Sequence, residues 1–254
     1  IRELTEHRIA TAKDGTARLS DAQTGRGLRV LPSQGGEVTS AAFSPDGQYL
    51  VATSLDNRDS QGTSRPGTAR VWRVATGEQV AELGETAYGG VWGADFSRDG
   101  KRLVTASEDN TARVWEVGSW RKLHDLIGHS GRVSRAVFSP DGKTILTTSA
   151  DLTARLWDAA SGQSRSELAG HTAYVLDGNF SPDGKSVVTT SLDGAPRLWD
   201  TDKGRELAVL RGHTAGVFSG TFDHRGQSVL TSSGDGTARV WEARTRPSLH
   251  ELQG

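Results

Sequence analysis

The stretch SGRVSRAVFSPDGKTILTTSADLTARLWDAASGQSRSELAGH, which runs from Ser130 to His171, consists of four short strand-like segments separated by turns. The segments are RVSRAVF, KTILTTS, TARLWD and SRSELAG, and the sequences between them are SPDG, ADLT and ASGQ. Alternation of apolar and polar residues is typical of a half-buried strand, and Pro, Gly, Asp and Ser favour turns. No helical period is visible. The stretch therefore predicts a small four-stranded antiparallel sheet.

This pattern is repeated along the chain. Close relatives of TARLW place a tryptophan every 42 or 43 residues, at Trp72, Trp115, Trp157, Trp199 and Trp241. A degenerate copy, TARLS, begins at Thr16. Four-stranded units repeated at about 40–45 residues are the signature of a β-propeller blade. We expect one domain, residues 1–254, made of the units 1–34, 35–86, 87–128, 129–170, 171–212 and 213–254.

Two further markers occur in register with the tryptophans. FSPDG or a looser version begins at Phe43, Phe96, Phe138, Phe180 and Phe222, and GH stands at Gly128, Gly170 and Gly212. WD occurs at Trp157 and Trp199, and WE replaces it at Trp115 and Trp241. With these motifs the chain resembles the WD40 repeat family over essentially its whole length, and its regular repeats are similar to those of bacterial members. The resemblance implies an all-β WD40 propeller with about six four-stranded antiparallel blades.

The two ends of the sequence suggest an incomplete ring. Ile1 aligns with the Phe of FSPDG, and Gly254 aligns with the Gly of GH. The chain therefore contains five copies of the first strand of the unit but six of each other strand. We expect that it does not form a fully paired six-blade ring alone. Either the ring is then larger than six blades and this chain is a segment of it, or the closing strand is omitted from these residues. The chain also contains no Met, which suggests a piece of a longer chain.

The resemblance implies a Ser-His-Asp-Trp hydrogen-bond tetrad inside each well-formed blade. His, Ser and Asp precede Trp by 28, 8 and 6 residues in three consecutive units. The three sets are His129, Ser149, Asp151 and Trp157; His171, Ser191, Asp193 and Trp199; and His213, Ser233, Asp235 and Trp241. A nucleophile needs one exposed site with an oxyanion hole, whereas a buried network recurs in every blade. We therefore interpret these residues as structural.

The tetrad is incomplete in the N-terminal half of the chain. Ala87 and Gln34 stand where the histidine belongs in the Trp115 and Trp72 units, and Pro66 replaces the aspartate of the Trp72 unit. The Trp72 unit also contains an insertion, SLDNRDSQGTSRPGT, from Ser54 to Thr68. We expect this polar insertion to be a solvated surface loop or a contact loop. Its Asp56, Asn57 and Asp59 lack the glycine and final glutamate of a calcium-binding loop.

Composition excludes several classes of function. The chain has 30 basic and 31 acidic residues, a net charge of −1 and no cysteine. Disulfides, thiolate metal sites and cysteine nucleophiles are therefore excluded, and no overall charge favours nucleic acid or an anionic membrane. No apolar run approaches the roughly 20 residues of a membrane span. We expect a cytoplasmic protein that binds no cofactor, metal, nucleic acid or membrane.

The sequence contains no Walker loop, HExxH or GxSxG motif, so we predict that the protein is not an enzyme. One catalytic alternative stays open, because some propellers carry an active site in the central channel. The first strands of the units offer only Asp95, Arg135 and Asp177 for such chemistry. An active site would require Asp95 and Asp177 to converge on one pocket.

The resemblance also implies a protein-protein interaction scaffold, which binds a protein or peptide through the top face of the propeller. The family's exposed top-face positions hold large apolar residues here, namely Trp92, Tyr174, Leu176, Leu192 and Phe218. Charged residues of the predicted rim are Arg132, Glu37 and Glu108. Large apolar patches of this kind mark partner sites, although the same side chains could pack against neighbouring loops. A second alternative is a sensor or regulatory domain of a larger bacterial signalling protein, with other domains of the same chain as partners.

Overall fold

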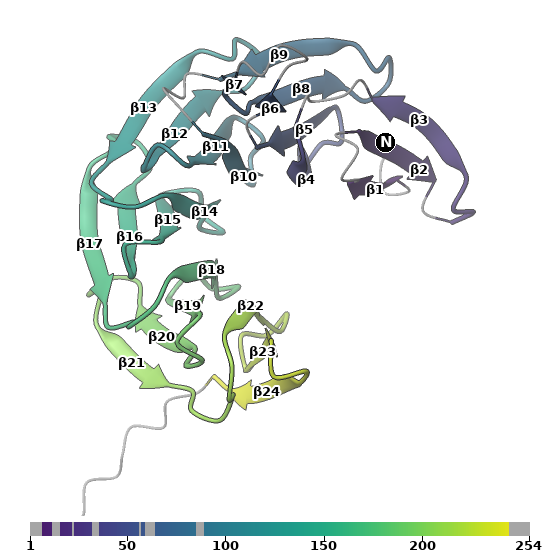
Figure 1. The fold of residues 1–254 in the computed structure, drawn as a ribbon. Coiled ribbons are helices and arrows are strands. Elements are labelled where there is room, and N and C mark those ends of the chain that lie inside the picture. The colour runs from purple at the N-terminus through teal and green to yellow at the C-terminus, as the bar shows by residue number, and fades with distance from the viewer. Residues whose placement is uncertain are drawn as a thin grey trace, which may run out of the picture.

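The computed structural model describes residues 7–11, 16–21, 23–31, 36–55, 57–58, 64–84 and 89–243. Every regular element in these ranges is a β-strand, and none is a helix that could cross a membrane. Six antiparallel sheets follow one another along an arc around an open centre (Figure 1). In each of the second to sixth sheets the first strand lies on the inner side of the arc. The all-β propeller architecture predicted from the sequence is therefore confirmed.

The sheets are numbered here in chain order, and neighbouring strands in each are hydrogen-bonded in sequence order. The first contains β1 (His7–Thr11), β2 (Ala17–Asp21) and β3 (Gly27–Leu31). The second contains β4 (Val38–Phe43), β5 (Tyr49–Ser54), β8 (Ala69–Arg73) and β9 (Gln79–Leu83). The third contains β10 (Val91–Phe96), β11 (Arg102–Ser107), β12 (Thr111–Glu116) and β13 (Lys122–Ile127).

The C-terminal half continues the same plan. The fourth sheet contains β14 (Val133–Phe138), β15 (Thr144–Ser149), β16 (Thr153–Asp158) and β17 (Ser164–Ala169). The fifth contains β18 (Val175–Phe180), β19 (Ser186–Ser191), β20 (Arg197–Asp200) and β21 (Glu206–Val209). The sixth contains β22 (Val217–Phe222), β23 (Ser228–Ser233) and β24 (Ala238–Glu242). The first and sixth sheets thus have three strands each within the described residues, and they stand at the two ends of an unclosed arc (Figure 1).

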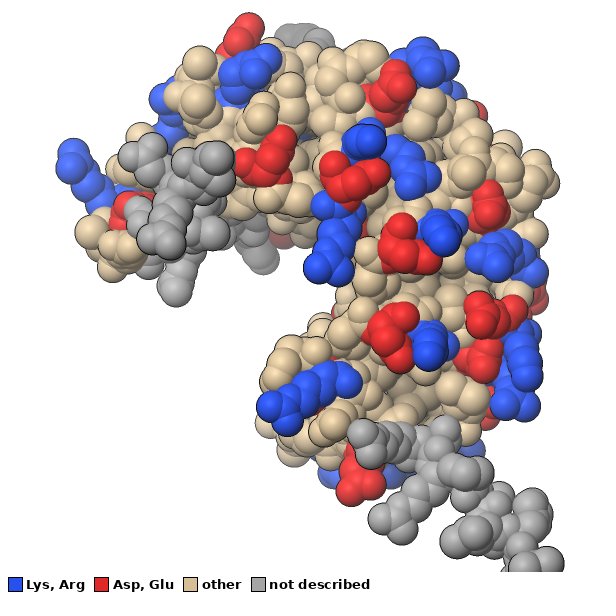
Figure 2. All heavy atoms as spheres, turned by 180° about the vertical axis from the view of Figure 1, so that it is seen from behind, with Lys and Arg blue, Asp and Glu red and all other residues tan. Residues whose placement is uncertain are grey.

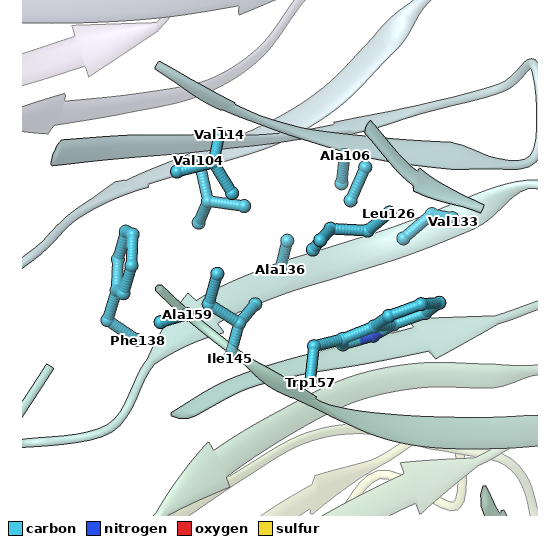
Figure 3. Close-up of a cluster of buried hydrophobic side chains, with 11 residues drawn as sticks. Val104, Ala106, Val114, Leu126, Val133, Ala136, Phe138, Ile145, Trp157 and Ala159 are labelled. Carbon is cyan, nitrogen blue, oxygen red and sulfur yellow. The ribbon is translucent and has the colours of Figure 1, made fainter. Parts of the chain in front are cut away.

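The core lies between consecutive sheets rather than at one centre. Figure 3 shows the layer between the third and fourth sheets, where Val114 and Leu126 of one sheet lie beside Ile145 and Trp157 of the next. Successive side chains on a strand point to opposite faces of the sheet. Runs of consecutive apolar residues therefore make both faces of an inner sheet apolar. Packing against both neighbours buries these faces, which a single sheet cannot do alone.

Polar contacts also join consecutive sheets. The Arg102 guanidinium of the third sheet donates hydrogen bonds to the carbonyl oxygens of Ala159 and Gly142 in the fourth, at 2.8 and 2.7 Å. It also lies 5.3 Å from the centre of the Phe138 ring. Between the second and third sheets, the Thr39 hydroxyl donates to the Val91 carbonyl oxygen at 2.7 Å. These bonds fix how far one sheet is rotated relative to the next.

The last sheet has one uncovered apolar face. Leu146 and Leu156 of the fourth sheet pair across strands and are fully buried against the fifth sheet. Leu230 and Val240 have the same pairing in the sixth sheet, yet Val240 is 71% exposed. The repeated sequence pattern therefore produces a core face in one sheet and an open surface in the other.

The insertion of the Trp72 unit is not simply a loop. It contains a two-stranded antiparallel sheet of β6 (Asn57–Arg58) and β7 (Ser64–Arg65), which the sequence did not predict. Backbone hydrogen bonds tie its base to the fold, from the Leu55 N–H to the Glu37 carbonyl at 3.0 Å and from the Gly67 N–H to the Gly89 carbonyl at 2.8 Å. Asp56 and Asp59 lie outside the described residues.

Candidate functional site

A buried chain of hydrogen bonds links four side chains in the fourth sheet. The His129 Nδ1 atom lies 2.7 Å from Asp151 Oδ2, and His129 Nε2 lies 2.8 Å from the Thr147 hydroxyl. The Trp157 indole N–H donates to that same hydroxyl at 2.8 Å. The same bonds recur in the fifth sheet through His171, Asp193, Thr189 and Trp199, and in the sixth through His213, Asp235, Thr231 and Trp241.

The structure corrects one member of the predicted tetrads. The hydroxyl between histidine and tryptophan belongs to threonine, whereas Ser149, Ser191 and Ser233 bond only backbone atoms. Ser149 donates to the Gly131 carbonyl at 2.8 Å and accepts from the Asp151 N–H at 3.1 Å, so it shapes the turn. Ser149 ends its strand, and Thr147 lies two residues nearer the indole. The sequence does carry this signal, since a threonine precedes four of the tryptophans by ten residues.

The bonding pattern is compatible with one tautomer of a neutral imidazole. An indole N–H can only donate, so the Thr147 oxygen accepts from Trp157, and its own hydrogen is available to His129 Nε2. A neutral imidazole in this arrangement carries its proton on Nδ1, where it donates to Asp151. In the fifth sheet, burial lowers the pKa of the His171 imidazole despite its hydrogen bond to Asp193, which favours the neutral ring there.

The aspartate carboxylates of these networks accept several hydrogen bonds from the protein. Burial raises the pKa of Asp151, but hydrogen bonds from His129, Thr153 and the Ser130 N–H outweigh it, so the pKa lies well below its ordinary value. The pKa of Asp193 is lowered in the same way, with burial opposed by hydrogen bonds from the Ala195 N–H and His171. Hydrogen bonds from within the fold thus engage both oxygens of each carboxylate.

The tryptophan N–H groups of the second and third sheets do not belong to the full hydrogen-bond network. In the third sheet Trp115 donates to Thr105 at 3.0 Å, and the buried Asp109 pairs with Arg113 at 2.6 Å. In the second sheet Ala52 occupies the register position of Thr105, and the buried Trp72 indole N–H has no hydrogen-bond partner among the described residues. Ala87 and Gln34, the residues at the two histidine positions, lie outside the described residues. Within the described part of the chain, the full network is therefore present in the fourth, fifth and sixth sheets.

We expect Thr189→Val to lower the free energy of unfolding by about 2 kcal/mol, because it leaves the Trp199 N–H and the His171 Nε2 atom buried without partners. Thr190→Val is the matched control, since the neighbouring Thr190 hydroxyl is buried and unpaired. That control should be neutral or stabilising. Urea unfolding followed by tryptophan fluorescence measures both, and equal losses would contradict the assignment.

Stability should fall as the pH is lowered from 7, in two steps. The folded pKa of His171 lies below its ordinary value near ~6.5, so the unfolded chain takes up this proton first and is favoured below that pH. The folded pKa values of Asp151 and Asp193 are also depressed, so their contribution is lost below about pH 4. Urea unfolding at stepped pH values and an NMR titration of the His171 ring measure this. A stability that rises towards pH 5 would contradict it.

Restoring the missing hydroxyl of the second sheet should stabilise the protein. Ala52→Thr offers an acceptor to the Trp72 N–H and is expected to raise the free energy of unfolding by about 1 kcal/mol relative to Ala52→Val. The valine variant has the same shape without the hydroxyl, so packing changes cancel in the comparison. If the two variants unfold at the same urea concentration, the indole does not need the bond.

A second set of residues gathers at one end of the sheets, which we call the top face. It is the end at which the first strand of each sheet begins and the second strand ends, since Val133 pairs with Ser149. The first strand of each of the second to sixth sheets carries a β-bulge directly after its first residue, and the extra residue is Thr39, Trp92, Ser134, Leu176 or Phe218. A bulge bends the strand and redirects its side chain. The fold therefore places these residues at the top face.

Three of the predicted top-face residues form a stack. The Arg132 guanidinium lies 4.3 Å from the centre of the Trp92 ring and 5.9 Å from that of Tyr174. The three side chains come from the third, fourth and fifth sheets. Trp92 and Arg132 are both partly buried, so the Trp92 side chain is less exposed to solvent than the sequence suggested. A cation between two aromatic faces is held in a fixed plane.

Further along the arc the predicted apolar residues are open to solvent. Tyr174 is 47% exposed, Leu192 is 44% exposed and Phe218 is 54% exposed. Leu176 is partly buried, and Glu37 is exposed. Glu108 instead turns back to accept a hydrogen bond from the Gly90 N–H at 3.1 Å, so it caps its own sheet.

Sequence reasoning missed one residue of this face. Leu152, in the turn after Asp151, is partly exposed and has a φ of 73°. The matching positions hold Asn110, Gly194 and Gly236, residue types that tolerate this left-handed conformation far better than leucine does. A leucine at this one turn position is the signal that would have found it. Backbone strain of this kind concentrates at functional sites.

The central-channel carboxylates do not form a catalytic pair. Asp95 accepts a hydrogen bond from the Phe138 N–H at 2.9 Å, and burial raises its pKa. Asp177 instead pairs with Arg135 at 3.3 Å and accepts from the Ser219 hydroxyl at 3.0 Å. A hollow of about 290 Å³ is lined by Asp95 and Arg135 but not by Asp177. Each carboxylate connects its strand to the next sheet, and the two do not converge.

Charge is evenly mixed on the face shown in Figure 2. Lysine and arginine side chains alternate there with aspartate and glutamate rather than gathering by sign. Ion pairs between neighbouring third and fourth strands, such as Arg155 with Glu167 and Arg197 with Glu206, also place opposite charges next to each other. A phosphate-binding surface needs a basic stripe, and this face offers none.

Repeated antiparallel sheets, three of which contain the same tryptophan-centred network, define a propeller of blade repeats. Residues 25–59, 77–116, 120–158, 162–200 and 204–242 match the family model described as "WD domain, G-beta repeat". These matches cover more than half of the chain, which therefore belongs to the WD40 repeat family.

Curated relatives match part of the chain. It is 34% identical to a guanine nucleotide-binding protein subunit beta of Arabidopsis thaliana, over 46% of this chain and 31% of the relative. It is 30% identical to nuclear distribution protein nudF of Aspergillus niger, over 50% and 32% of the two chains. It is 26% identical to guanine nucleotide-binding protein subunit beta-1 of Drosophila melanogaster, over 49% and 34%. The chain thus spans about a third of the length of these relatives, and all three are eukaryotic.

Proposed function

We propose that this chain is a non-catalytic scaffold that binds a protein or peptide through its top face. The observation that carries the proposal is the run of exposed Tyr174, Leu192 and Phe218 at one end of two consecutive sheets. Large apolar side chains in solvent are costly when isolated, and clustered aromatic residues are typical anchors of protein interfaces. Membership of the WD40 repeat family and similarity to G-protein beta subunits support a protein partner in general.

The geometry disfavours the enzymatic alternative. Asp95 and Asp177 each bind a different neighbouring sheet, and the three histidine networks use their acceptors internally. The regulatory-domain alternative is compatible with the proposal, because the partner could be another domain of the same chain. A cytoplasmic location and a bacterial origin stay predictions of the sequence.

Truncating the anchors should weaken binding without unfolding the protein. We expect Tyr174→Ala and Phe218→Ala each to reduce capture of the partner by about 2 kcal/mol, or some thirtyfold, with the melting midpoint nearly unchanged. Ile127→Ala is the matched control, since Ile127 is a large exposed apolar residue on the outer strand β13. Quantitative affinity capture compares the variants. Partner capture that survives the double Tyr174→Ala, Phe218→Ala variant would overturn the proposal.

A further inference from the structure

Arg132 is an unpaired cation within an aromatic stack. Its guanidinium contacts the Trp92 and Tyr174 rings, and it forms no ion pair or side-chain hydrogen bond within the described part of the chain. Its Nε atom is buried without an acceptor. Other arginines at interior positions have carboxylate partners, such as Arg113 with Asp109 and Arg135 with Asp177. The Nε atoms of Arg113 and Arg135 are buried in the same way, so what distinguishes Arg132 is its lack of a carboxylate partner within the described residues, which points to one supplied from outside.

Two acidic side chains near this end of the sheets, Asp151 and Glu108, are already engaged within the fold. Asp151 accepts hydrogen bonds from His129, Thr153 and the Ser130 N–H. Glu108 is bound to the Gly90 N–H. Neither carboxylate neutralises Arg132, so the cation stays available at the surface. The stack also holds the guanidinium flat, which lowers the entropy lost when it binds a ligand.

We propose that Arg132 receives a carboxylate from the partner, an Asp or Glu side chain that lies beside a large apolar residue. A guanidinium presents two parallel N–H donors that match the two oxygens of a carboxylate. Tyr174, Leu192 and Phe218 provide exposed apolar surface on the next two sheets for the adjacent apolar side chain. This inference rests on the proposed function and specifies the chemistry of the same surface.

A carboxylate fits better than a phosphorylated residue. Phosphorylated and strongly acidic motifs are usually bound by clusters of arginines. Of the charged residues predicted for the top face, Arg132 is cationic, and Glu37 and Glu108 are acidic. A single guanidinium balances a singly charged carboxylate but only partly neutralises a phosphate, whose charge is about −2.

Selection from a random peptide library displayed on phage tests this directly. Wild-type protein should enrich peptides with Asp or Glu next to Leu, Ile, Phe or Trp. Arg132→Gln should lose the acidic preference and keep the apolar one. Lys143→Gln, which removes the same charge from an exposed turn at the opposite end of the sheet, should select as the wild type does.

The most enriched peptide then gives a quantitative test. Changing its acidic residue to the amide should weaken binding to the wild type about tenfold or more, and to Arg132→Gln by less than about twofold. A phosphoserine at that position should bind no more tightly than the glutamate. An unchanged tenfold loss in Arg132→Gln would overturn the inference, as would an absence of enriched peptides.

The outcomes separate this inference from the proposed function. Enriched peptides that need Phe218 but carry no acid would refute the role of Arg132 and leave the top-face scaffold intact. Peptides that bind equally well to Arg132→Gln and to the double Tyr174→Ala, Phe218→Ala variant would refute both. Tighter binding of the phosphoserine peptide would replace the carboxylate with a phosphate ligand.

Discussion

The fold depends on burying a large indole between two sheets without leaving its N–H unpaired. A threonine hydroxyl solves this in four sheets by accepting from Trp115, Trp157, Trp199 or Trp241. In three of them the same hydroxyl is also hydrogen-bonded to a histidine Nε2 atom, and the other ring nitrogen of that histidine is bonded to an aspartate in the turn after the second strand. The hydrogen bonds around each buried indole thereby connect the third strand, the second strand, the turn between them and the loop before the first strand. Trp72, which lacks this arrangement, is equally buried and depends on packing alone.

Much of this architecture could be predicted because each sheet is encoded locally. The strands, the turns and the His-Asp-Trp sets follow from spacings within about 42 residues. The bridging hydroxyl was misassigned to Ser149 because spacing alone cannot show which of two hydroxyls on one strand face lies level with the indole. Thr147 was visible in the sequence, but only the strand register places it beside the ring.

The candidate surface was harder to predict, because it is assembled from different sheets. The residues of the top face were predicted from family positions alone, and the bulges at Trp92 and Phe218 lie at the ends of the strands where that prediction places them. The stack of Arg132 between Trp92 and Tyr174 depends on the distance between neighbouring sheets, about which the sequence contains no direct information. The hairpin of β6 and β7 escaped prediction for a different reason, since two-residue strands leave almost no periodic pattern.

The uncovered face of the sixth sheet has a consequence for dynamics. In a linear array each sheet is stabilised by its neighbours, and the sheet of β22 to β24 is held on one face only within the described structure. Its amide hydrogens should therefore exchange with solvent sooner than those of β15 and β16, through local opening that spares the rest of the arc. Phe218 belongs to this sheet, so a ligand that contacts it would also slow the opening. Slower exchange of the backbone amide hydrogens in β22 to β24 would then indicate that a ligand is bound at the top face.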